Sequence, residues 1–184
     1  MGHIYLYYGD GGGKTTSALG LALRSVGHKH RVAVIQFMKW FRETGEYKIQ
    51  PMLSPYYSIH QFGEPGWIKL VEKSPENVEE EIQTRKLDEK DTIAAKRALE
   101  FARGTIETEP PKLLILDEVC LAVHYGILPV KDVLDLLEEV PENTDVVMTG
   151  RYAPKEMIER ADFVNKIVSE KAPAKFVNKE GIQF

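Results

Sequence analysis

The stretch YYGDGGGKTTSALG, residues 7–20, decides how this chain folds. An apolar strand pattern over residues 3–8 leads into a glycine-rich loop, and residues 14–26 then follow a helical pattern that ends at Gly27. Because glycine has no Cβ atom, such a loop can curl until successive backbone N–H groups point inward and hold an anion. The helix adds its unpaired first N–H groups and the positive end of its dipole. The stretch therefore predicts a polyphosphate-binding loop between a strand and a helix.

The side chains of this loop support the same interpretation. Lys14 offers a mobile positive charge to phosphate oxygens, and Thr15 offers a hydroxyl to Mg²⁺. The common pattern G-x-x-x-x-G-K-[ST] is not met, because Tyr8 stands where the first glycine belongs and Gly9 comes one place late. A glycine-rich turn without a ligand is the alternative, but the flanking strand and helix favour a binding loop. The residues expected to contact the phosphates are Gly9, Asp10, Gly11, Gly12, Gly13, Lys14, Thr15 and Thr16.

A second motif is LLILDE, residues 113–118. A carboxylate at the carboxyl end of a buried parallel strand faces the crevice where open α/β sheets bind ligands. Asp117 is therefore expected to hold Mg²⁺ beside Thr15, and the adjacent Glu118 is of the kind that activates water in many P-loop enzymes. A plain strand end is the alternative. No guanine-reading N-K-x-D follows, which favours ATP over GTP.

Composition narrows the class of protein. The chain has 184 residues and a formal net charge of −4, so no basic surface for nucleic acid or acidic membranes is expected. Its single cysteine, Cys120, excludes an internal disulfide and fits a cytoplasmic protein. There is no signal-peptide pattern, and no apolar run long enough for a membrane helix. The five histidines lack metal-ligand spacing, so no zinc site is expected. We expect one domain over residues 1–184.

The remaining pattern alternates between strands and helices, which predicts an α/β fold with a mostly parallel sheet. Residues 39–56 and the tail, about residues 171–184, are expected to be irregular. The further predicted strands are residues 31–38, 58–62, 112–118, 145–150 and 163–168, and the further helices are residues 75–101, 129–139 and 154–161.

Taken together, these motifs resemble the ATP:corrinoid adenosyltransferases of the P-loop class. The resemblance runs from about residue 4 to 184, and the late first glycine is normal in that family. It implies a RecA-like three-layer α/β/α domain with a six-stranded sheet of order 3-2-4-5-1-6, numbered along the chain. The matching segments are GDGGGKTTSALGLALR, VAVIQFMKW, LLILDEVCLAV, LPVKDVLDLLEEVP, VVMTGRYAP and ERADFVNKIVSEK.

The resemblance also implies a reaction. The cobalt(I) of a reduced corrinoid, such as cobalamin, attacks the ribose C5′ carbon of ATP, and triphosphate leaves. ATP and the corrinoid are then substrates and Mg²⁺ or Mn²⁺ is the cofactor, held by Thr15 and Asp117. The family suggests a homodimer and allows for an electron-donor protein as a partner. The candidate catalytic residues are Lys14, Arg151 and Glu118; further candidate binding residues are Gln36, Lys39, Glu46 and Trp67, with Arg42 in the same loop as Glu46.

Some positions depart from the family pattern. Gly12 stands where the family loop has a lysine, and Lys69 stands where an aromatic residue is usual two places after Trp67. Cys120-Leu121 and Ala172 also differ. Two other functions stay open on sequence alone: a plain ATPase or kinase, in which Glu118 activates water, and an ATP-binding sensor without catalytic activity.

Overall fold

The computed structural model describes residues 2–68, 84–173 and 179–182. Its main sheet has six strands, all parallel, in the order β3-β2-β6-β7-β1-β8. Numbering the six predicted strands along the chain, this order is 3-2-4-5-1-6, so the predicted topology is confirmed. The strands are β1 (Ile4–Tyr8), β2 (Val32–Phe37), β3 (Tyr57–Phe62), β6 (Leu113–Asp117), β7 (Asp145–Gly150) and β8 (Phe163–Lys166).

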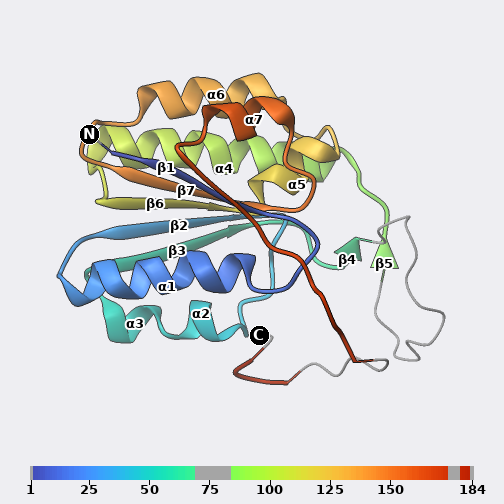
Figure 1. Cartoon of the computed structure of the whole chain (residues 1–184), viewed down its shortest axis with the longest axis horizontal. Helices are drawn as coiled ribbons and strands as arrows, with labels where there is room; N and C mark the ends of the chain where they lie inside the picture. Colours follow the sequence, from blue (N-terminus) through green and yellow to red (C-terminus); the bar gives the residue numbers. More distant parts are fainter. Residues whose placement is uncertain (1, 69–83, 174–178, 183–184) are drawn as a thin grey trace.

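Helices cover both faces of this sheet, as Figure 1 shows. Neighbouring side chains of the inner strand β2 point to opposite layers: Val34 packs in the cluster that contains Ala18 of α1, and Ile35 packs in the cluster that contains Ala98 of α4. The three-layer α/β/α class is therefore confirmed. One layer holds α1 (Lys14–Gly27), α2 (Gly45–Lys48) and α3 (Gln50–Leu53); the other holds α4 (Glu89–Thr108), α5 (Val119–His124), α6 (Val130–Glu139) and α7 (Lys155–Arg160).

The predicted helix over residues 75–101 has the wrong limits. Residues 69–83 lie outside the described part of the chain, and β5 (Thr84–Arg85) pairs with β4 (Trp67–Ile68). Helix α4 begins only after Asp88, whose side chain accepts a hydrogen bond from the Lys90 amide while the Asp91 carboxylate accepts one from the Asp88 amide. This capping box fixes the start of the helix. The charged helical pattern in the sequence extends to both sides of this capping box, so the pattern did not indicate where α4 begins.

Short helices were also missed. Residues 39–56, expected to be irregular, contain α2 and α3. Helix α5 follows β6 almost directly, because Glu118 adopts a left-handed backbone (φ 62°) that turns the chain between them. Its apolar sequence VCLAV continues the apolar pattern of the strand, so it gave no signal of its own. None of the described helices is long and apolar enough to cross a membrane.

The strand register aligns polar side chains at the carboxyl edge of the sheet. Gln36 on β2 lies level with Gln61 on β3 and with Asp117 on β6. Because all strands are parallel, the loop that follows β1 leaves the sheet at the same edge. The fold thus collects the loop and these polar strand ends in one place.

Candidate functional site

The glycine loop owes its shape to close backbone contacts. Gly9 has φ +118°, and a Cβ atom there would lie 2.3 Å from the carbonyl oxygen of Ile167. The Gly11 amide donates to that same oxygen at 3.0 Å. The segment after β8 therefore excludes any side chain at Gly9, which gives the late first glycine a steric reason. Gly13, with φ +102°, precedes α1 and provides no side-chain cap, so the first amides of the helix remain available to an anion.

Lys14 lies inside the loop rather than in solvent. Its side chain is buried, and Nζ donates to the Gly11 carbonyl oxygen at 2.7 Å. Burial lowers the pKa of this lysine, Glu118 opposes that shift, and Arg151 adds to it. The ammonium is thus held within the loop by a neutral carbonyl oxygen. A phosphate oxygen would offer it a stronger, charged partner.

Asp117 is the centre of the polar network at the sheet edge. Its fully buried carboxylate accepts hydrogen bonds from the hydroxyls of Thr15 (2.9 Å) and Thr149 (2.6 Å) on Oδ1. On Oδ2 it accepts from Gln36 Nε2 (3.0 Å) and from Lys39 Nζ (2.7 Å). Burial alone would raise the pKa of Asp117, but Lys39 and the hydroxyl donors outweigh it and hold the pKa below its usual range. Asp117 is therefore an anion in the folded protein.

Thr149 and Gln61 complete this network, and neither was predicted as a site residue. The Thr149 hydroxyl accepts from the Glu118 amide at 2.9 Å while it donates to Asp117. Gln61 Nε2 donates to Gln36 Oε1 at 2.9 Å and to the Phe41 carbonyl oxygen at 3.2 Å. Both are polar residues near the carboxyl end of a predicted strand, and this position is the sequence feature that could have identified them. The feature indicates a site only once the order of the strands in the sheet is known.

Glu118 stands beside the network, and within the described part of the chain no hydrogen bond joins its side chain to it. Its Oε2 atom is buried without a hydrogen-bond partner among the described residues. Burial raises its pKa most, Asp117 raises it further, and the lysines 39 and 14 oppose this shift. Glu118 therefore gives up its proton less readily than an ordinary glutamate.

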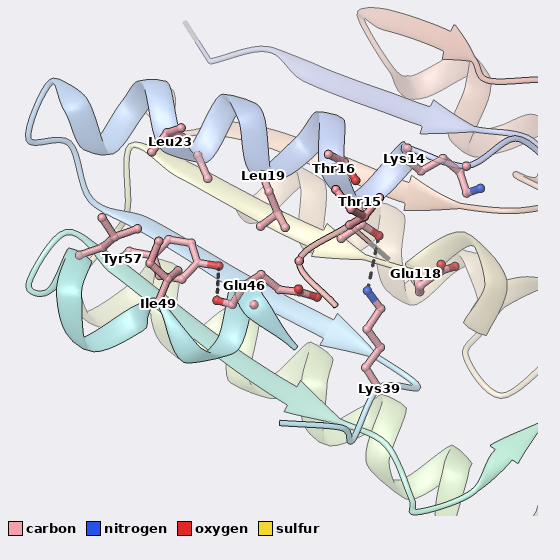
Figure 2. A pocket seen from close by; sticks show the side chains of 17 residues that line it. Lys14, Thr15, Thr16, Leu19, Leu23, Lys39, Glu46, Ile49, Tyr57 and Glu118 are labelled. Atoms are coloured by element: carbon pink, nitrogen blue, oxygen red, sulfur yellow. Dashed lines mark hydrogen bonds between the residues drawn. The ribbon is translucent and has the colours of Figure 1, made fainter. Parts of the chain in front are cut away.

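A cavity of about 1010 Å³ extends from the glycine loop along α1. Figure 2 shows Lys14, Thr15 and Thr16 at one end of it and Ile49 and Tyr57 at the other. One end is thus polar and suited to phosphates, whereas the other is apolar and suited to a flat organic group. The lining residues are Gly12, Gly13, Lys14, Thr15, Thr16, Leu19, Ala22, Leu23, Lys39, Gly45, Glu46, Ile49, Leu53, Tyr57, Glu118, Gly181 and Ile182.

The structure brings most of the predicted residues to this place, but not all of them. Glu46 lines the cavity, and its backbone oxygen accepts from the Tyr57 hydroxyl at 3.1 Å. Arg42 instead lies over the Tyr47 ring, 5.7 Å from its centroid, and is not among the residues that line the cavity. Asp10 is exposed to solvent and is not among the residues that line the cavity.

Arg151 follows Gly150, whose φ is +143° and where a Cβ atom would lie 2.8 Å from Cys120 Cβ. Because the backbone at Gly150 runs close to Cys120, Arg151 lies near enough to influence the pKa values of Lys14 and Glu118. The backbone of Trp67 belongs to β4, but its side chain and the whole of Lys69 lie outside the described part of the structure.

The residues present fit a magnesium ion that is shared with a nucleotide. Within residues 2–68, 84–173 and 179–182, no three His, Cys, Asp or Glu side chains lie together as a metal site. Thr15 and Asp117 do supply a hydroxyl and a carboxylate in direct contact. Since Mg²⁺ usually takes one or two protein oxygens and completes its shell with phosphates and water, this small oxygen set suits it.

A strand, a glycine loop that encloses a lysine, a helix with an N-terminal threonine and a strand-end aspartate beside it define a P-loop nucleotide-binding protein. Comparison with known proteins narrows the class. A sequence profile of the family "ATP:corrinoid adenosyltransferase BtuR/CobO/CobP" matches residues 1–184. The chain belongs to this family.

Relatives with related names cover nearly the whole chain. A corrinoid adenosyltransferase of Escherichia coli (strain K12) is 31% identical over 182 residues, which is 99% of this chain and 82% of the relative. One from a Sinorhizobium species is 32% identical over 186 residues, covering 100% of this chain and 80% of the relative. Corrinoid adenosyltransferase CobA of Salmonella typhimurium (strain LT2) is 30% identical over 182 residues, 99% of this chain and 82% of the relative.

Proposed function

We propose that this protein transfers the 5′-deoxyadenosyl group of ATP to the cobalt(I) of a reduced corrinoid and releases triphosphate. Its family membership supports this activity, and one structural observation carries it: the phosphate loop and the Asp117 network open into one cavity with an apolar far end. ATP needs both kinds of surface, because its triphosphate is highly charged and its adenine ring is flat and apolar on its faces.

The loop is proposed to bind the leaving group. Lys14 would exchange its contact with the Gly11 oxygen for a triphosphate oxygen, and the backbone amides at the start of α1 would add neutral donors. Arg151 lies close enough to contribute a second positive charge. Stabilising the negative charge that develops on the departing triphosphate is the largest electrostatic task in such a reaction.

The protein itself needs no nucleophile in this mechanism. Cobalt(I) supplies the electron pair that forms the new bond to C5′, and the electrons of the C5′–O bond leave with the triphosphate. Cys120 does not compete as a nucleophile, because it is buried and burial raises the pKa of its thiol to about 12. What this chain supplies is positioning of C5′ against the corrinoid and exclusion of water.

Mg²⁺, or Mn²⁺ in its place, is proposed to be held by Thr15 and Asp117. A bound divalent cation neutralises triphosphate charge and so makes triphosphate a better leaving group. Glu118 is proposed to shape this site or to orient water on the metal rather than to act as a base, because no proton leaves a cobalt nucleophile. Trp67 is proposed to contact the corrinoid, and Glu46, which lines the cavity, to contact ATP. Gln36 is fully buried and is proposed to act indirectly, by holding Asp117 in place.

Two further proposals concern the surroundings of the enzyme. The active form is proposed to be a homodimer in the cytoplasm, with an electron-donor protein that reduces the corrinoid to cobalt(I).

An ATPase or an ATP-binding sensor without catalytic activity is less favoured, since the chain belongs to an adenosyltransferase family. The family's loop has a lysine where this chain has Gly12, so this chain has one positive charge fewer near the phosphates. Lys14 and Arg151 are proposed to be sufficient without it.

The test is an anaerobic incubation with ATP, Mg²⁺ and chemically reduced cobalamin. We expect one equivalent of adenosylated corrinoid, which is photolabile and has a distinct visible spectrum, for each triphosphate formed. ATP binding with neither product would support the sensor, and ADP with orthophosphate would support the ATPase. Lys14→Ala, which is expected to bind ATP more weakly, serves as the control at low ATP concentration.

A further inference from the structure

The ammonium of Lys39 lies at the position where the two proposed metal ligands meet. Its Nζ is 2.7 Å from Asp117 Oδ2 and 3.4 Å from Thr15 Oγ1. Figure 2 shows the side chain extending toward Thr15 from the opposite side of the pocket. A positive charge of the chain itself therefore contacts the same hydroxyl and carboxylate that the proposed function assigns to a divalent cation.

The backbone around Lys39 is shaped to aim the side chain at this point. Met38 has φ +58°, a left-handed conformation that is unfavourable for any residue with a Cβ atom and that the surrounding structure must enforce. The Met38 amide donates to the Phe62 oxygen at 2.8 Å, and a Cβ atom at Gly63 would lie 2.6 Å from the Met38 carbonyl carbon. The turn after β2 is thus pressed against the turn after β3, which directs Lys39 back to the sheet edge.

Electrostatics explains why a cation is needed there. Asp117 is fully buried, and its other donors, Gln36, Thr15 and Thr149, are neutral. A buried carboxylate without a counter-ion is strongly unfavourable, so the Lys39 charge stabilises the folded, ligand-free protein. A divalent cation bound to the same carboxylate would repel the ammonium at close range. The ammonium and a divalent cation would therefore compete for Asp117.

We propose that Lys39 is a built-in counter-ion that holds the metal site in shape and is displaced by the metal when ATP binds. The inference rests on the proposed function in one respect, the assignment of the metal to Thr15 and Asp117. Lys39 lines the same cavity as Lys14, so the displaced ammonium reaches the space in which triphosphate lies. Triphosphate then gives Lys39 a new partner, and metal and ATP bind more tightly together than either binds alone.

Binding of Mn²⁺ alone, followed by the electron paramagnetic resonance signal of free Mn²⁺, tests the competition. Lys39→Met should bind Mn²⁺ on the order of tenfold more tightly than the unaltered protein, because one charge-assisted hydrogen bond no longer competes with the metal. Lys48→Met is the matched control, since Lys48 pairs with the exposed Glu43 and its loss removes a positive charge without touching Asp117. It should leave Mn²⁺ affinity within about twofold.

A third variant, Asp117→Asn, separates failure of this inference from failure of the proposed metal site. If Asp117→Asn binds Mn²⁺ as the unaltered protein does, the metal site is misplaced and the proposed function is wrong in that respect. If Asp117→Asn loses Mn²⁺ but Lys39→Met gains no affinity, the metal site stands and the counter-ion role is refuted.

The unaltered protein gives a second readout if Lys39→Met does not fold. With ¹⁵N-labelled lysine, the ammonium held by Asp117 should give a ¹H–¹⁵N signal, assigned by its absence in Lys39→Arg. Titration with Mg²⁺ alone should shift or remove this signal in proportion to metal bound at Asp117. A signal unchanged at saturating Mg²⁺ would overturn the proposal.

Discussion

Thr149→Val tests the polar network around Asp117 with a change of a single oxygen atom. The Thr149 hydroxyl is fully buried, donates to the charged Asp117 Oδ1 and accepts from the Glu118 amide. A hydrogen bond to a charged group contributes about 1.5–3 kcal/mol, and a buried amide left without a partner costs about 1–3 kcal/mol. The extra methyl group offsets about 1 kcal/mol of this sum by apolar burial. We expect a loss of roughly 3 kcal/mol in the free energy of unfolding.

The measurement is urea-induced unfolding of Thr149→Val beside Thr144→Val. Thr144 is a well-matched control, because it is also buried but its hydroxyl donates to the neutral carbonyl oxygen of Pro111. Its substitution should cost only about 1 kcal/mol and leave activity intact. Thr149→Val should also weaken Mn²⁺ binding, since Asp117 loses a partner that orients it. Equal stability losses in the two variants, with normal metal binding in both, would refute the network as described.

Three more predictions use the same geometry. Lys14→Ala should lower ATP affinity by one to two decades, measured by calorimetry, because a charge-assisted phosphate contact is lost; unchanged affinity would remove the loop from the binding site. Glu118→Gln should keep adenosyl transfer within about tenfold, whereas loss of a catalytic base usually costs about 10²–10⁴-fold; a collapse of several decades with ATP still bound would favour water activation. The ring centroid of His60 lies 4.4 Å from that of Phe101, and burial lowers the pKa of His60. Because His60 takes up a proton more readily in the unfolded chain, it destabilises the folded protein as pH falls below about 6.5. His60→Gln should therefore flatten the dependence of stability on pH between about pH 7 and 5, measured by urea titrations at each pH. An unchanged profile in His60→Gln would contradict the effect of burial on His60.

The meeting of Thr15 and Asp117 was predictable from the sequence. Each follows from a local pattern, a helix start after a glycine loop and the end of an apolar strand, and the parallel sheet brings such ends together. The structure places their oxygen atoms 2.9 Å apart. The strand order came from resemblance to a family rather than from periodicity, and it is confirmed.

What could not be predicted depends on tertiary contacts between segments distant in sequence. Thr149 and Gln61 join the site only because β7 and β3 lie at particular places in the sheet. The position of Lys39 on Asp117 depends on the close approach of Gly63 to the turn at Met38, which no local pattern encodes. The start of α4 was missed for the opposite reason: its capping box was present in the sequence but embedded in a longer charged pattern.

The glycine loop is proposed to hold a triphosphate that leaves intact. A single-turnover reaction under anaerobic conditions, with cobalt(I) cobalamin and ATP labelled with ³²P at the γ-phosphate and ³H at C5′, tests it directly. We expect ³²P in inorganic triphosphate and ³H in the adenosylated corrinoid, in equal amounts. Release of ³²P as orthophosphate while ³H stays in ADP would refute adenosyl transfer, because the phosphorus and not the carbon would then be the atom under attack.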